Sequence, residues 1–154
     1  MISNDELREL YQEIILDHNK DPRNFGRVEN CTHHAEGYNP LCGDQLSITM
    51  RVEDGVIRDV KFEGEGCAIS KATASLLTSE LIGKTEADAE RVFTALQETV
   101  TSSSDSEIAA ELGKLSVIAG VREFPARVKC ATLAMHTVRN ALKGQHNAST
   151  EALS

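Results

Sequence analysis

Three cysteines and one aspartate have side chains that could bind a metal or react with sulfur. Cys42 and Asp44 are separated by one glycine in a loop that leads into a predicted strand. Cys67 follows Gly64-Glu65-Gly66 at a predicted strand-to-helix corner, and Cys130 lies in the first turn of the last predicted helix. All three cysteines lie at ends of elements, where distant side chains can converge, and Asp44 offers an oxygen from the same loop as Cys42. The glycines beside Cys42 and Cys67 permit close backbone approach and unusual φ values.

Three thiolates and one carboxylate form a tetrahedral donor set that suits Zn²⁺. The same sulfur-rich set suits an iron–sulfur cluster, in which the carboxylate is a weak and exchangeable ligand. Structural zinc sites usually contain Cys and His alone, so Asp44 indicates a site that can open. A sulfur released from the metal could then attack a persulfide, as in thiol–disulfide exchange. Spacing alone leaves another interpretation open, which is three unrelated buried cysteines.

Local charges favour thiolate forms at two of these positions. Helix N-termini stabilise anions, which applies to Cys67 and Cys130. Arg127 and Lys129 add positive charge near Cys130. Both could equally be ordinary surface charges at the start of a helix.

The first half of the sequence predicts one helix and about three short strands. The helix has an apolar stripe and is broken at residues 21–26. A short edge strand is expected near residues 34–38, and strict alternation predicts the next strand over residues 46–52. The turn Glu53-Asp54-Gly55 then leads to a strand with Val56, Val60 and Phe62 on its inner side. The stripe of the helix consists of Leu7, Leu10, Tyr11, Ile14 and Ile15.

The second half predicts four helices. Apolar residues at helical spacing begin at Ile69, and a capping box at residues 85–88 precedes the next helix. The third helix is expected to end at Gly120, and the last to span residues 127–143. The apolar stripe of the helix that ends at Gly120 consists of Ile108, Leu112, Leu115 and Ile118. We therefore expect an α+β fold, in which helices cover one face of a small antiparallel sheet of about three strands. A single domain over residues 1–144 would precede a disordered polar tail at 145–154.

Composition excludes several classes of function. The 154 residues include 24 acidic and 16 basic ones, for a net charge of −8, which argues against general nucleic-acid binding. No apolar run approaches the ~20 residues of a membrane span. The acidic start of the sequence does not resemble a signal peptide. We therefore expect a cytoplasmic protein whose cysteines are ligands or reactive thiols rather than disulfides.

Four sequence motifs follow one another along the chain: Leu16-Asp17-His18 with residues 22–26, then residues 39–44, 66–70 and 125–130. Together they resemble the motifs of the U-type iron–sulfur cluster assembly proteins, the IscU/SufU family. The resemblance covers nearly the whole chain and keeps the family's order of motifs. The IscU branch, a scaffold that builds a 2Fe–2S cluster, has a histidine immediately before its last cysteine, where this sequence has Lys129. The Cys67–Cys130 interval is also longer than in that branch, and both departures resemble the SufU branch.

The resemblance implies a zinc-dependent sulfur acceptor that receives persulfide sulfur from a pyridoxal-phosphate cysteine desulfurase. Cys42 would be the acceptor, and Asp44, Cys67 and Cys130 would hold Zn²⁺ with it, while Arg127 would assist the exchange. Such a protein relays sulfur to cluster assembly and recipient proteins, and is a sulfurtransferase rather than a classical turnover enzyme.

Two other functions remain open. The same Cys and Asp ligands could assemble a 2Fe–2S cluster for transfer to apo-proteins, or a zinc ion could simply stabilise the fold. Cys31 matches none of the family's motifs and is interpreted as an incidental loop cysteine. Adjacent His33 and His34 would point to opposite faces of a strand, so at most one could be a ligand, and a surface position is favoured for both.

Overall fold

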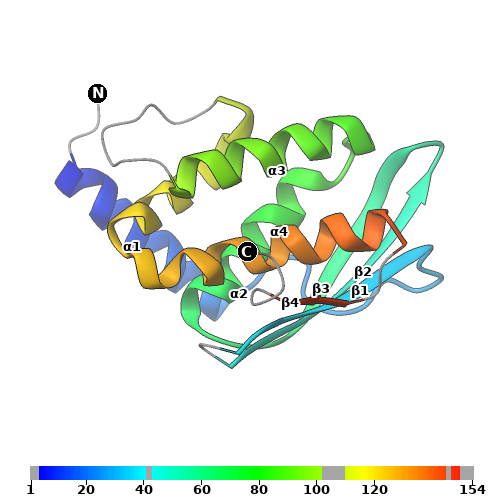
Figure 1. Cartoon of the computed structure of the whole chain (residues 1–154), viewed down its shortest axis with the longest axis horizontal. Coiled ribbons are helices and arrows are strands. Elements are labelled where there is room, and N and C mark those ends of the chain that lie inside the picture. Colours follow the sequence, from blue (N-terminus) through cyan, green and yellow to red (C-terminus); the bar gives the residue numbers. More distant parts are fainter. Residues whose placement is uncertain (1–3, 41–42, 102–109, 145–146, 150–154) are drawn as a thin grey trace.

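A four-stranded sheet and a set of helices on one of its faces make up the fold (Figure 1). The structure is a computed structural model and describes residues 4–40, 43–101, 110–144 and 147–149. The strand order is β3-β2-β1-β4. The strands are β1 (His33–Asn39), β2 (Asp44–Glu53), β3 (Val56–Glu65) and β4 (Asn147–Ser149).

The expected antiparallel sheet of three strands is confirmed. β2 pairs antiparallel with both β1 and β3, and the turn at residues 54–55 joins β2 to β3. β4 adds a short parallel strand to the outer edge of β1. The sequence predicted a disordered tail from residue 145, whereas Asn147–Ser149 form a strand in the structure. Residues 145–146 and 150–154 lie outside the described part of the chain. Polar residues can join a sheet edge because backbone groups make the bonds.

The inner side of β3 differs from simple alternation. Val60 and Phe62 are fully buried, as predicted, but Val56 is only partly buried and Ile57 takes the core position. The pairing with β2 shifts between Arg51 and Val52, where a β-bulge interrupts the register. An extra residue in one strand reverses the facing of the residues beyond it, which explains why Ile57 and not Val56 points inward.

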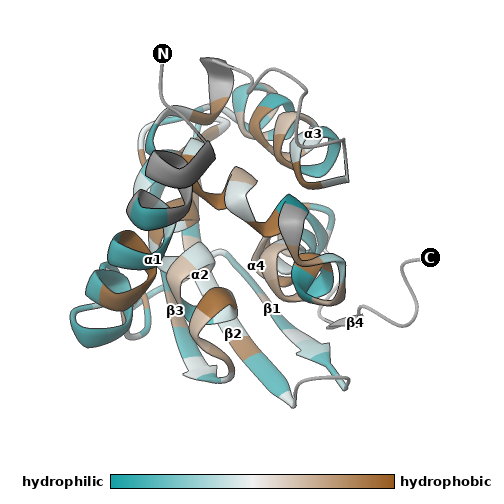
Figure 2. Cartoon of the chain, turned by 90° about the vertical axis from the view of Figure 1, so that its left-hand side faces the viewer, coloured by the Kyte–Doolittle hydropathy of each residue, from teal (hydrophilic) through white to brown (hydrophobic). Residues whose placement is uncertain are grey.

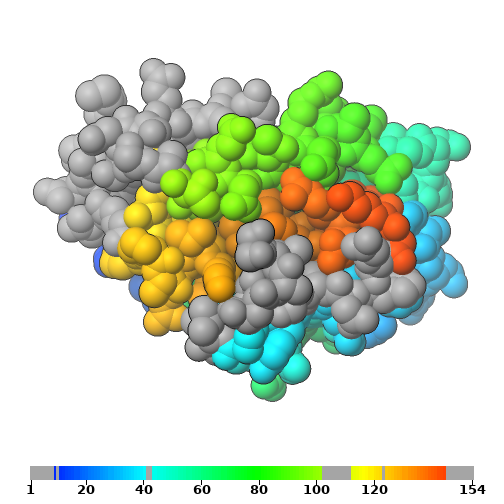
Figure 3. All heavy atoms as spheres, in the orientation of Figure 1, coloured from blue at the N-terminus to red at the C-terminus, as the bar shows by residue number. Residues whose placement is uncertain are grey.

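The helices form two layers above the sheet. α4 packs on β1 and β2, and α2 packs on β3, while α1 and α3 pack against these two helices. Figure 2 shows α1, α2 and α4 on the same side of the sheet. Figure 3 shows α3 (green) beside α4 (orange), where Arg139 forms an ion pair with Glu90 at 2.8 Å. The helices are α1 (Asn4–Lys20), α2 (Ala68–Leu81), α3 (Glu86–Thr101) and α4 (Val128–Leu142).

The predicted helices are found with one exception. The Asp88 N–H donates to the Thr85 hydroxyl at 3.1 Å, as expected of a cap at the start of α3. In α1, Tyr11 and Ile15 are buried and Ile14 is partly buried, while the side chains of Leu7 and Leu10 lie outside the described set. Among the described residues, no helix is long and apolar enough to cross a membrane.

The helix predicted to end at Gly120 is a 3-10 segment, η1 (Ala110–Glu123), rather than a regular α-helix. Leu112, Leu115 and Ile118 are buried as predicted, whereas Ile108 lies outside the described residues. Gly113 has φ 54 and ψ −130 and interrupts the helical path. Gly120 was predicted to end this helix, but it lies inside the segment. A Cβ at this position would come within 2.8 Å of the Tyr11 ring. Close packing on Tyr11, and not termination, explains this glycine.

His18, near the end of α1, is buried against α2. Its Nδ1 lies 2.6 Å from the Ser75 Oγ. Burial lowers the pKa of His18 below its ordinary value, and the positive charge of Arg23 lowers it further. The unfolded chain therefore binds a proton at this histidine more readily than the folded chain does. Stability from this site is fully present above about pH 6.5 and is lost as the pH falls toward the lower folded-state pKa.

We expect the free energy of unfolding to decrease between about pH 7.5 and pH 5.5 because both His18 and His136 have lowered pKa values in the folded chain. The substitution His18→Gln keeps a hydrogen-bonding side chain but cannot bind the proton. Urea unfolding at both pH values should show a smaller decrease in this variant than in the wild type. An unchanged decrease would contradict the assignment to His18.

Candidate metal centre

Three of the four predicted ligands meet at one end of the sheet. Asp44 is the first residue of β2, Cys67 is the N-cap residue of α2, and Cys130 lies in the first turn of α4. One ligand atom from each lies within 4.8 Å of the others. Cys42 lies outside the described residues, and sequence alone places it two positions before Asp44.

The carboxylate of Asp44 is fully buried and held from two sides. Its Oδ1 accepts a hydrogen bond from the Cys67 backbone N–H at 2.7 Å, and its Oδ2 accepts one from the Asn39 side-chain amide at 3.0 Å. Hydrogen bonds to a charged acceptor are stronger than neutral ones, so they offset part of the cost of burying the charge. The Asp44 side chain is therefore already oriented before a metal ion binds.

Cys67 begins α2 and is half-buried. The Ser70 backbone N–H donates to its Sγ at 3.4 Å, in the manner of a side-chain helix cap. The pKa of the Cys67 thiol is lowered to about 6, chiefly because Cys130 hydrogen-bonds to it, and the Ser70 N–H lowers the pKa further. Burial and the negative charge of Asp44 act against this decrease and raise the pKa. Thiolate character at this helix start agrees with the sequence prediction.

Cys130 is fully buried, and Cys31, Cys67 and Cys130 are thiols rather than disulfides. The Asn39 amide Nδ2 lies 3.5 Å from the Cys130 Sγ, and donates toward it. The backbone on the other side of the site approaches closely at Gly66, where a Cβ would come within 2.6 Å of the Asp44 Oδ1. Any other residue at position 66 would displace the carboxylate, so the glycine before Cys67 has the role predicted for it.

The donor set fits a tetrahedral zinc ion. Zn–S and Zn–O bonds of ordinary length place a thiolate sulfur and a carboxylate oxygen about 3.6 Å apart across a tetrahedral centre. The Cys67 Sγ and the Asp44 Oδ2 are 3.8 Å apart in the structure. Two thiols and one carboxylate supply three ligands, and a tetrahedral ion has room for a fourth, which can exchange.

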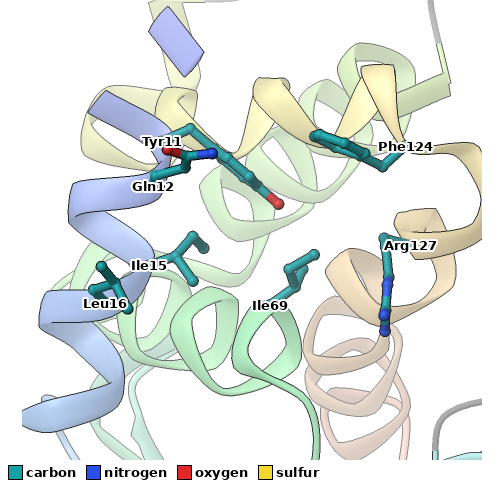
Figure 4. Close-up of a pocket in the computed structure, with 7 residues that line it drawn as sticks. All are labelled: Tyr11, Gln12, Ile15, Leu16, Ile69, Phe124 and Arg127. Atoms are coloured by element: carbon teal, nitrogen blue, oxygen red, sulfur yellow. The ribbon is translucent and has the colours of Figure 1, made fainter. Parts of the chain in front are cut away.

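An apolar pocket of about 420 Å³ opens beside this centre (Figure 4). Tyr11 and Leu16 of α1, Ile69 of α2, and Phe124 and Arg127 before α4 line it, together with Gln12 and Ile15. The Tyr11 and Phe124 rings stack with centroids 6.4 Å apart. Figure 4 shows the Tyr11 hydroxyl directed into the space between Ile69 and Arg127.

Tyr11 connects the pocket to the thiols electrostatically. Burial raises the pKa of Tyr11 to about 12; the negative charges of Cys67 and Cys130 raise it as well, and Arg127 lowers it. Arg127 is exposed and lines the pocket rather than joining the ligand atoms. Its charge therefore acts on the same region that holds the two thiols.

The remaining candidates lie elsewhere. Within the described chain, the group of metal-ligating side chains includes neither Cys31 nor the histidines at 33 and 34. His34 is exposed, whereas His33 is partly buried and its Nδ1 lies 2.8 Å from the Thr32 hydroxyl. Lys129, at the start of α4, is partly buried.

Sequence reasoning missed Asn39 and Tyr11 as neighbours of the site. Asn39 is in the same motif as Cys42 and Asp44, so a signal for it existed in the sequence. Tyr11 appeared only as one member of an apolar helical stripe. Nothing in its spacing distinguishes a ring that lines a pocket from one that fills a core.

Fold and site together define a class: an α+β protein in which thiols and a carboxylate from three separate elements form a candidate metal centre. The family model described as the NifU-like N-terminal domain matches residues 10–144. The chain belongs to this family, which includes the IscU and SufU proteins of iron–sulfur cluster assembly.

Similar proteins agree with this assignment. The chain is 39% identical over 136 residues to a Bacillus subtilis protein named zinc-dependent sulfurtransferase SufU, covering 86% of this chain and 89% of the relative. It is 35% identical over 143 residues to the iron–sulfur cluster assembly scaffold protein IscU of Streptococcus pyogenes, covering 93% and 89%. The crystal structure of a protein named FiSufU from Fervidobacterium islandicum superposes with a TM-score of 0.79 at 32% identity, covering 88% and 98%.

Proposed function

We propose that this protein is a zinc-dependent sulfur acceptor that takes persulfide sulfur from a pyridoxal-phosphate cysteine desulfurase and relays it to iron–sulfur cluster assembly. The observation that carries the proposal is the convergence of Asp44, Cys67 and Cys130 within 4.8 Å, next in sequence to the loop of Cys42. Lys129 in place of the histidine of the IscU branch and the similarity to the Bacillus subtilis sulfurtransferase support it.

Cys42, Asp44, Cys67 and Cys130 would hold the zinc ion, which keeps cysteine sulfur as thiolate at neutral pH. Four anionic ligands against Zn²⁺ leave an excess of negative charge, and Arg127 offsets part of it. A thiolate in such a set stays nucleophilic, because its charge is not fully neutralised. The carboxylate of Asp44 is the hard ligand among soft thiolates, so it is the weakest ligand of the set and the one that exchanges most easily.

The transfer step conserves atoms and electrons. The thiolate of Cys42 attacks the outer sulfur of the desulfurase persulfide and forms a new S–S bond. The S–S bond of the donor persulfide breaks, and the desulfurase cysteine leaves as a thiolate. The outer sulfur keeps its oxidation state, so the step needs no external oxidant or reductant.

The docking surface of the desulfurase would surround the site. Leu16 and Phe124, which both line the pocket, are 61% and 42% exposed, so the pocket presents apolar side chains at the surface. Arg127 adds a positive charge at the same rim. A desulfurase loop that presents an apolar residue beside its persulfide cysteine would fit this surface.

The proposal is tested by metal analysis and desulfurase turnover. The protein purified without added metal should contain about one zinc per chain and should increase the rate at which a cysteine desulfurase forms alanine from cysteine. Removal of zinc with a chelator should abolish the increase, and added zinc should restore it. A metal-free protein that stimulates the desulfurase equally well would refute the zinc-dependent role.

A scaffold function is the second candidate. The Streptococcus pyogenes relative is named a scaffold, and a carboxylate among thiolates is a suitable labile ligand for a 2Fe–2S cluster carried as cargo. Anaerobic protein given iron and sulfide should then show the absorption spectrum of a 2Fe–2S cluster, and an apo-protein recipient should acquire it. Absence of a transferable cluster would leave sulfur relay as the function.

Circular dichroism after chelation separates both candidates from a zinc site that only stabilises the fold. The core contains fully buried side chains from the sheet and the helices, such as Phe62, Leu77 and Leu133, so it does not depend on metal ligands. We expect helix and sheet signals to persist when the metal is removed. Cooperative unfolding on chelation would instead support a structural zinc site.

A further inference from the structure

Asn39 lies at the base of the loop that carries Cys42. It is the last residue of β1 and pairs directly with Asp44, the first residue of β2. Both side chains are fully buried, with 0% exposure. Directly opposed residues of an antiparallel pair have adjacent side chains, so this pair closes the hairpin beneath residues 40–43. The two ends of the loop are thus connected by a side-chain hydrogen bond as well as by the sheet.

The amide of Asn39 contacts two of the candidate ligands. Its Nδ2 donates to the Asp44 Oδ2 at 3.0 Å and lies 3.5 Å from the Cys130 Sγ. A side-chain amide carries two N–H donors, so both contacts can form together. The Asp44 Oδ1 accepts from the Cys67 N–H at 2.7 Å, so each carboxylate oxygen accepts a hydrogen bond from a nitrogen donor of the fold.

We infer that Asn39 is a positioning residue of the metal centre, which fixes Asp44 for ligation through a single oxygen and holds Cys130 as the sulfur that stays on the metal. Its amide nitrogen has no lone pair available for a metal, so it acts through Asp44 and Cys130 and is not itself a ligand. This inference rests on the proposed metal centre and adds the residue that sets its geometry.

These contacts have two physical effects. The Cys67 N–H already occupies the Asp44 Oδ1, which disfavours ligation through both oxygens, and the Asn39 amide fixes the orientation of Oδ2, the oxygen 3.8 Å from the Cys67 Sγ. A hydrogen bond to a thiolate withdraws charge from the sulfur, so Cys130 becomes less nucleophilic than a thiolate without such a donor. Partners of this kind orient metal ligands, and their loss typically costs about 10–100-fold in metal affinity.

The test compares two variants with a matched control. Asn39→Ala removes the donors, and Asn39→Leu removes them while keeping a similar volume. Gln97→Leu makes the same change of amide to leucine at a partly buried position of α3. Zinc affinity is measured by competition with a chromophoric chelator, and Co²⁺ is bound as a spectroscopic probe. Thermal unfolding of each protein with and without zinc shows whether the metal still stabilises it.

We expect about 10–100-fold weaker zinc binding in both Asn39 variants and wild-type binding in Gln97→Leu. In the Co²⁺ proteins the thiolate charge-transfer intensity should be retained, while the ligand-field bands should shift because the oxygen ligand changes. Wild-type affinity with an unchanged cobalt spectrum in either Asn39 variant would overturn the inference, as would an equal loss in Gln97→Leu. If Asn39→Ala does not fold, Asn39→Leu decides. A wild-type protein that binds neither metal would instead refute the proposed function.

Discussion

Replacing Cys42 with alanine should abolish sulfur acceptance and reduce desulfurase stimulation to the rate of the desulfurase alone. The proposed step needs a nucleophilic sulfur at this position, and alanine offers no atom that could form the new S–S bond. Cys67 and Cys130 are poor substitutes. Cys67 caps α2 and Cys130 is fully buried, so both are held by the fold.

The measurement follows labelled sulfur from radioactive cysteine onto the protein, with alanine formation measured in parallel. Cys31→Ala is the matched control, because it removes a thiol of the described chain that lies outside the ligand group. This control should accept sulfur like the wild type. Normal stimulation by Cys42→Ala would exclude Cys42 as the acceptor and would point to one of the two thiols that the structure places together.

Replacing Asp44 with alanine should weaken zinc binding by more than about 100-fold, because loss of a ligand exceeds the effect of losing its supporting hydrogen bonds. The change also leaves the Cys67 N–H and the Asn39 amide without the carboxylate that they now bind. The Asn39 donor is buried and the Cys67 donor is partly buried, so part of the loss comes from donors left unsatisfied. Metal competition assays would measure it.

The same variant distinguishes zinc-dependent relay from scaffolding. If the chain assembles a 2Fe–2S cluster, removal of a labile carboxylate ligand should make that cluster more persistent in a recipient assay. Asp59→Ala on β3 is the control, since it removes a carboxylate outside the ligand group. Zinc affinity equal to that of the wild type in Asp44→Ala would exclude Asp44 as a ligand.

Local patterns in the sequence determined most of the elements. Alternation over residues 46–52 predicted β2, and apolar stripes predicted α1, α2 and α3, because burial of one face imposes a period that neighbouring residues reveal. The same reasoning placed Cys67 and Cys130 at ends of elements and Asp44 in the loop of Cys42. It could not show that their ligand atoms come within 4.8 Å of one another.

Only the tertiary structure decided the features that depend on pairing between distant segments. The bulge that turns Ile57 inward arises from the register of β3 on β2, and the need for glycine at position 120 arises from the Tyr11 ring of another helix. Asn39 contacts Cys130, 91 positions away, because β1 packs under α4. A sequence records the local period of burial, whereas contacts across the core depend on how whole elements pack, and no short window contains that information.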